Sequence, residues 1–173
     1  SAGISRGSLK YLADTGRLDQ VSRGVYTLPE VWEDEFVSIQ ERYKRGVFAL
    51  DTALFLHDLT DRTPHKFHMA FPYGYNTSSP KAAGILCSCK KEPYYSLGIA
   101  LVDTPAGNTV WAYNAEKTLC EILKPISHTD IQIITDAFKR YAGRKDKNIP
   151  LLSEYAHQLR VEKRLRPYLE VLL

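Results

Sequence analysis

Histidine and cysteine side chains could bind a metal, but their spacing in this sequence is poor for that purpose. His68 lies on one predicted strand with His65 just before it, Cys87 and Cys89 lie on another strand, and Cys120 follows later. Structural zinc sites usually separate paired cysteines by about two to four residues, whereas one residue separates Cys87 from Cys89. We therefore expect ordinary core thiols and strand histidines, and no bound metal.

Acidic residues beside a lysine raise a second possibility, a magnesium-dependent nuclease. Asp103 ends a predicted strand, and Glu116 and Lys117 begin the helix after the next strand. The usual nuclease arrangement places acid and lysine one residue apart on a single strand, and this sequence lacks it. A solvated first helical turn explains Glu116 and Lys117 better than a nuclease site does. No nucleophile elbow or phosphate-binding glycine-rich loop is present, so we expect no enzymatic activity and no cofactor.

Basic side chains gather at the two ends of the 173-residue chain, although the formal net charge is only +3. Residues 1–28 hold four basic and two acidic side chains, and residues 138–173 hold nine and four. Such clusters bind phosphates or a partner protein, but they can equally be solvated helix ends. The C-terminal candidates for an antitoxin or partner surface are Arg144, Lys145, Arg160, Lys163, Arg164 and Arg166.

The N-terminal basic residues lie in a short helix followed by a two-stranded ribbon. Ser5 can cap a helix over residues 5–15, and Gly16 suits the position after its last turn. Strands are predicted over 18–21 and 25–28, with Arg23 in the turn between them. This is the order of the second half of a winged helix, whose helix enters the major groove while the ribbon contacts phosphates. The candidate DNA contacts are Arg6, Ser8, Lys10, Tyr11, Arg17 and Arg23.

A pattern this short also fits a small αββ unit whose arginines are merely solvated. A helix-turn-helix unit needs a further helix before its recognition helix, so the winged-helix interpretation predicts a segment upstream of Ser1. The two interpretations remain open on pattern alone.

The rest of the chain predicts a second, α+β domain. An amphipathic helix from Trp32 to Gly46 follows the ribbon, and we place the domain boundary near residue 46, giving domains 1–46 and 47–173. Period-two alternation from Lys66 indicates a strand with one buried face, and further short strands follow up to Tyr113. Four helical segments complete the chain, the first capped by Asn114. We expect a small, mostly antiparallel sheet covered by the C-terminal helices.

The first 30 residues resemble the N-terminal domain of the abortive-infection AbiEi family, the antitoxin and repressor half of type IV toxin–antitoxin systems. The resemblance is carried by Gly3-Ile4-Ser5, Leu9 with Leu12, Gly16-Arg17-Leu18, and Arg23-Gly24-Val25-Tyr26 with Pro29. Two later segments, "GVFALDTALFLHDLTDRTP" and "YNAEKTLCEIL", resemble the family more loosely.

The resemblance implies a DNA-binding repressor of its own operon, acting on double-stranded operator DNA with inverted repeats. It also implies a role in phage defence, in which the second domain neutralises a nucleotidyltransferase-like toxin without requiring a tight complex. The alternatives are a nuclease-like domain with a DNA-binding arm, or a non-catalytic protein-interaction module. No apolar run is long enough to span a membrane and no secretory signal is visible, so we expect a cytoplasmic protein.

Overall fold

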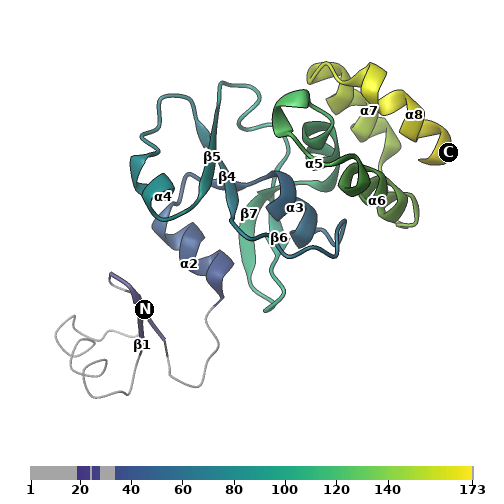
Figure 1. Ribbon diagram of the computed structural model, residues 1–173. Helices are drawn as coiled ribbons and strands as arrows, with labels where there is room; N and C mark the ends of the chain where they lie inside the picture. The colour runs from purple at the N-terminus through teal and green to yellow at the C-terminus, as the bar shows by residue number, and fades with distance from the viewer. Residues whose placement is uncertain (1–18, 24, 28–33, 173) are drawn as a thin grey trace. The chain divides into compact units, whose positions relative to one another are not determined.

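The computed structural model describes residues 19–23, 25–27 and 34–172 (Figure 1). The helix predicted over residues 5–15 lies outside these ranges, together with Arg6, Ser8, Lys10, Tyr11 and Arg17. The chain divides into two units between Lys44 and Arg45, close to the boundary predicted near residue 46.

The described part of the first unit contains the predicted hairpin and one helix. Strands β1 (Asp19–Ser22) and β2 (Val25–Thr27) pair antiparallel, with Asp19 opposite Thr27 and an irregularity before Ser22. Helix α2 (Glu35–Arg42) begins after Asp34, whose carboxylate accepts from the Phe36 N–H at 3.1 Å. This cap satisfies one of the N–H groups that a helix start leaves without a partner. The helix ends at Arg42, before the Gly46 expected from the sequence.

The second unit has a five-stranded sheet and a helical layer, which confirms the predicted α+β class. The strands are β3 (Val47–Phe48), β4 (His68–Pro72), β5 (Leu86–Lys90), β6 (Ile99–Asp103) and β7 (Thr109–Tyr113). The helices are α3 (Leu50–Leu56), α4 (Ser78–Ala82), α5 (Ala115–Ile122), the 3₁₀ helix η1 (Pro125–Ser127), α6 (Ile131–Ala142), α7 (Ile149–Gln158) and α8 (Glu162–Leu172).

The sheet is mixed, which corrects the prediction of a mostly antiparallel one. Its strand order is β5-β4-β3-β7-β6. The β3–β4 and β6–β7 pairs are antiparallel, whereas β4–β5 and β3–β7 are parallel. The parallel β4–β5 pair follows from α4, because a helical crossover returns the chain to the end at which the previous strand began. The five residues of α4 show no clear helical pattern in the sequence, so this crossover was not predicted.

Strand β4 is buried on both faces rather than one. Met69, Ala70 and Phe71 are successive residues, and each is fully buried. Successive side chains of a strand point to opposite faces, so both faces of the sheet are covered at this central position. The alternation seen in the sequence reflects the half-buried strand ends, not a solvent-facing side.

Helix α5 joins the sheet to the helical layer. All eight of its residues are buried, since α3, α6 and α7 pack around it. Figure 1 shows α6, α7 and α8 gathered beyond α5, to one side of the sheet. The C-terminal helices therefore pack mainly on α5 and on one another, and the main apolar core lies among α3 and these helices.

Candidate nucleic-acid interface

Arg23 is the one candidate DNA contact that falls within the described ranges. It lies in the turn between β1 and β2, and its side chain is exposed. The hairpin predicted from the sequence is therefore present, with Arg23 at the end that joins its strands. An exposed arginine at the tip of a ribbon can reach a phosphate without any rearrangement of the strands.

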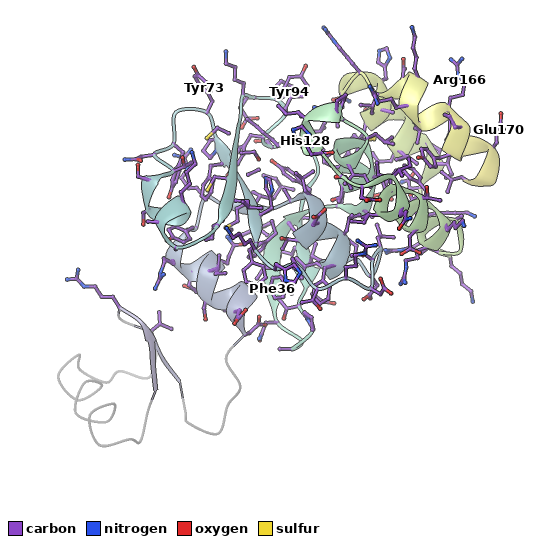
Figure 2. The ribbon with its side chains drawn as sticks, in the orientation of Figure 1. Phe36, Tyr73, Tyr94, His128, Arg166 and Glu170 are labelled. Atoms are coloured by element: carbon purple, nitrogen blue, oxygen red, sulfur yellow. The ribbon has the colours of Figure 1, made fainter. Side chains whose placement is uncertain are left out.

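The C-terminal basic residues fall into two structurally different groups. Arg160, Lys163, Arg164 and Arg166 are all exposed, from the end of α7 along α8. Figure 2 shows Arg166 and Glu170 on α8, at the C-terminal edge of the second unit. These four side chains are free to contact a partner, but the helix also carries acidic residues that reduce its local positive charge.

Arg144 is different because the fold itself uses its guanidinium. Two of its nitrogens donate to the Asp146 carboxylate at 2.8 and 2.7 Å, and Nη1 donates to the His57 carbonyl at 2.9 Å. The guanidinium thus connects the chain after α6 to the end of α3, and Arg144 is only partly exposed while Lys145 is exposed. The paired Arg144 lowers the pKa of the exposed Asp146 carboxyl to about 2.

Glu116 and Lys117, expected in a solvated helical turn, are buried. Asn114 does cap the helix as predicted, accepting from the Lys117 N–H at 2.9 Å. However, Glu116 retains 8% and Lys117 0% of its exposure, because the helix is surrounded on every side. The solvated interpretation of these two charges is therefore wrong.

The Lys117 ammonium is enclosed by groups that satisfy it. It donates to the carbonyl oxygens of Tyr94 at 2.6 Å and Leu97 at 2.7 Å. It also lies 3.7 Å from the centroid of the Tyr113 ring and 3.6 Å from the Glu121 carboxylate. Burial lowers the pKa of Lys117 to about 8, against the opposing effect of the Glu121 charge. With its donors engaged inside the protein, Lys117 is a structural charge.

Glu121 is shared between two lysines. Lys90 on β5 lies 3.0 Å from one of its oxygens and donates to the other at 3.1 Å. His68, on the adjacent strand β4, has a pKa lowered to about 4, chiefly by burial and then by the Lys90 charge. Its Nε2 is buried and has no hydrogen-bond partner in the part of the chain that the structure describes. The imidazole is therefore neutral at physiological pH.

A second buried contact holds Glu116. The Tyr141 hydroxyl donates to Glu116 Oε1 at 2.8 Å and accepts from the Asn148 N–H at 2.7 Å. Burial is the main cause that raises the pKa of Tyr141. Asp103, by contrast, is exposed at the end of β6. The two carboxylates are therefore in separate places: Glu116 lies inside the helical layer and Asp103 lies at a strand end.

The histidines and cysteines considered for a metal do not converge. Cys87, Cys89 and Cys120 are free thiols, and Cys120 is buried with its Sγ 3.6 Å from the Leu152 carbonyl. Within residues 19–23, 25–27 and 34–172, no group of three or more metal-ligating side chains is gathered. None of the helices searched there is long and apolar enough to cross a membrane.

The Lys90–Glu121–Lys117 cluster was not predicted from the sequence. Lys117 and Glu121 stand at i and i+4 of one helix, which is a recognisable pairing signal. Lys90 comes from a strand far away in the sequence, and no local pattern indicates that its side chain meets Glu121.

Comparisons with known proteins agree with the resemblance read from the N-terminal motifs. Residues 1–29 match the family model described as transcriptional regulator, AbiEi antitoxin. No curated protein sequence matches the chain. The crystal structure of the RV2827C protein from Mycobacterium tuberculosis is similar, with a TM-score of 0.54 and 15% sequence identity over 98% of this chain and 70% of that one. The fold is thus shared with a solved structure, and residues 1–29 are similar to the AbiEi antitoxin family of transcriptional regulators.

Proposed function

We propose that this protein is a DNA-binding transcriptional repressor and the antitoxin of a type IV toxin–antitoxin system. In this proposal it binds inverted repeats in the promoter of its own operon. It also neutralises a nucleotidyltransferase-like toxin encoded beside it, as part of abortive infection in the bacterial cytoplasm. The proposal gives the DNA-binding role to the first unit and the neutralising role to the second.

The match of residues 1–29 to the antitoxin regulator family is the observation that carries this proposal. The exposed Arg23 between β1 and β2 supports its DNA-binding half. In a winged-helix arrangement the preceding helix would contact bases and phosphates through Arg6, Ser8, Lys10 and Tyr11, while Arg17 and Arg23 would bind mainly phosphates. Phosphate contacts of this kind add affinity that does not depend on base sequence.

The test is a titration of the full chain against its own promoter duplex at several salt concentrations. Arg23→Ala should weaken binding about equally to promoter and unrelated duplexes, and should reduce the salt slope by about one unit. Arg166→Ala, which removes an exposed arginine from the second unit, is the matched control and should leave both quantities unchanged. A salt slope that Arg23→Ala does not alter would remove the hairpin from the interface.

The proposal assigns no catalytic step to this chain. The nuclease alternative would need Asp103 and Glu116 to hold a metal together, whereas Glu116 already binds the Tyr141 hydroxyl. Incubation with Mg²⁺ or Mn²⁺ should leave duplex and single-stranded DNA intact. Cleavage that Asp103→Ala abolishes would restore the nuclease interpretation.

A further inference from the structure

Two adjoining hollows in the second unit form one groove beside the edge strand β5. One has a volume of about 550 Å³ and the other about 680 Å³. They share Leu50, His68, Cys87, Ile126 and Ser127, so they are continuous with each other. The β5 groove, as we call it, runs between β5 on one side and the region around η1 on the other.

Lysines line the β5 groove along its length. They are Lys66, Lys81, Lys90, Lys91 and Lys124. Glu121 neutralises Lys90 through the buried ion pair, and it has Lys117 as a second partner. The other acidic residue among the lining side chains in the described ranges is Asp51. The four remaining lysines therefore give the groove an excess of positive charge, which attracts an extended anion.

Tyrosine rings stand beside these lysines. Tyr94 lines the groove and is 39% exposed, and Tyr73 beside it is 70% exposed. The Lys91 ammonium lies 4.8 Å from the centroid of Tyr73, and that of Lys124 lies 6.0 Å from the centroid of Tyr94. Figure 2 shows Tyr73 and Tyr94 along the same edge of the unit, both pointing away from the ribbon. Each ring thus has a cation beside it and a surface open to solvent.

We propose that the β5 groove binds single-stranded nucleic acid, with its lysines on the phosphates and Tyr94 and Tyr73 stacked on unpaired bases. Proteins that bind single strands combine a basic channel with exposed aromatic rings in this way. A duplex keeps its bases stacked on one another and offers no free base face to a tyrosine. An acidic peptide would use the lysines but would leave the two exposed rings without a planar partner.

Polar residues also line the groove. The buried Nε2 of His68, which has no hydrogen-bond partner in the described ranges, belongs to a residue that lines both hollows. Ser88 lines the groove from β5, and Ser127 lines it from η1 on the opposite side, where the Ser127 hydroxyl already donates to the Lys124 carbonyl at 2.8 Å. The Ser88 hydroxyl can donate to or accept from a base edge once the base is unstacked.

The test uses the full chain and fluorescein-labelled twenty-nucleotide oligo(dT) and oligo(U), with binding followed by fluorescence anisotropy. Unlabelled promoter duplex is present in excess so that it occupies the DNA-binding site of the first unit. We expect binding in the micromolar range or tighter that weakens as salt is raised. The Lys91→Ala/Lys124→Ala double variant should weaken binding at least tenfold and lower the salt slope by about 1.4, because two phosphate contacts are lost.

The ring is tested separately from the charge. Tyr94→Ala should weaken oligonucleotide binding about tenfold, whereas Tyr94→Phe, which keeps the stacking surface, should stay within about twofold. The Tyr94 carbonyl that accepts from Lys117 belongs to the backbone and is present in both variants. Lys139→Ala, an exposed lysine on α6 outside the groove, is the matched control and should have no effect.

Each contrary result overturns the proposal in its own way. Absence of binding to either oligonucleotide removes it outright, as does an equal loss in Lys139→Ala. Binding that Arg23→Ala abolishes and the lysine double variant leaves intact would assign the single strand to the first unit. Equal competition by pyrophosphate or poly-glutamate would make the groove a general anion site. Promoter binding by the groove variants should be normal, so failure of the groove proposal is distinguishable from failure of the repressor proposal.

Discussion

Lys117 and Tyr113 form a cation–π contact inside the second unit, with the ammonium 3.7 Å from the ring centroid. Tyr113 is the last residue of β7 and Lys117 lies in the first turn of α5, so the contact spans the junction between the sheet and the helical layer. The Tyr113 hydroxyl also donates to the Tyr95 carbonyl at 2.7 Å, which fixes the ring. Strand, helix and the loop before β6 are therefore held together around one buried charge.

Replacing that charge should destabilise the second unit strongly. Lys117→Met keeps the volume of the side chain but leaves the Tyr94 and Leu97 carbonyls without their donor. Breaking a buried, hydrogen-bonded charge in this way costs about 3 kcal/mol of unfolding free energy. Urea unfolding followed by circular dichroism measures the change, and Lys139→Met on the exposed face of α6 should lie within about 0.5 kcal/mol of the parent. A Lys117→Met protein as stable as the parent would show that the charge is dispensable.

Stability should fall in mild acid because of His68. Its pKa is about 4 in the folded protein against 6.5 for the unfolded chain, so the unfolded chain takes up the proton first as pH falls. The contribution is complete above pH 6.5 and is lost towards pH 4, at about 1.4 kcal/mol for each unit of pKa difference. Burial lowers the pKa of His57 as well, which adds to the loss in the same direction.

The His68 contribution is measured by urea unfolding at a series of pH values. His68→Gln should flatten the decline between pH 6.5 and 4, since the variant no longer has a proton to bind there. His65→Gln, an exposed histidine just before β4, should retain the decline of the parent. If both variants decline equally, His68 is not the group responsible.

Arg144 and Lys145 are neighbours in sequence but should behave differently. Arg144→Ala removes the hydrogen bond to the His57 carbonyl and should lower the unfolding free energy by about 1 kcal/mol, since the guanidinium is partly exposed. Lys145→Ala should change it by less than about 0.5 kcal/mol. Equal stability of the two variants in thermal or urea unfolding would show that the link from α6 to α3 contributes nothing.

Charge reversal in the exposed cluster at α7 and α8 should abolish toxin neutralisation and leave DNA binding unchanged. We consider a full-chain variant with glutamate in place of Arg160, Lys163, Arg164 and Arg166. This variant should still bind the promoter but should no longer rescue cells that express the toxin. Reversing the charge of exposed residues leaves the fold intact, but the new carboxylates repel an acidic surface on the partner. Growth rescue and promoter titration are measured side by side. Full rescue by the reversed protein would make this cluster a solvated helix face.

Local signals in the sequence were sufficient for individual elements but not for their surroundings. Asn114 and the apolar pattern after it predicted α5 correctly, and the Arg23 turn predicted the hairpin. The burial of Glu116 and Lys117 could not be predicted in the same way, because their partners Tyr141, Tyr94 and Leu97 come from other elements. A charged pair in a first turn has the same sequence pattern whether water or protein surrounds it.

The mixed sheet was missed for a related reason. β3 has only two residues, too few to show any periodicity, yet it lies between β4 and β7 at the centre of the sheet. The strand order follows from pairings between distant segments, and propensity within each segment says nothing about them.

The central position of β3 also has a consequence for how the protein is made. As the ribosome releases the chain from its N-terminus, Val47 and Phe48 emerge long before Thr109–Tyr113, the strand that completes their pairing. Until Tyr113 leaves the exit tunnel, β3 has one exposed edge and helices α6, α7 and α8 have not yet emerged. The second unit is therefore still an open sheet on the nascent chain, and this interval is a period in which chaperones can bind it.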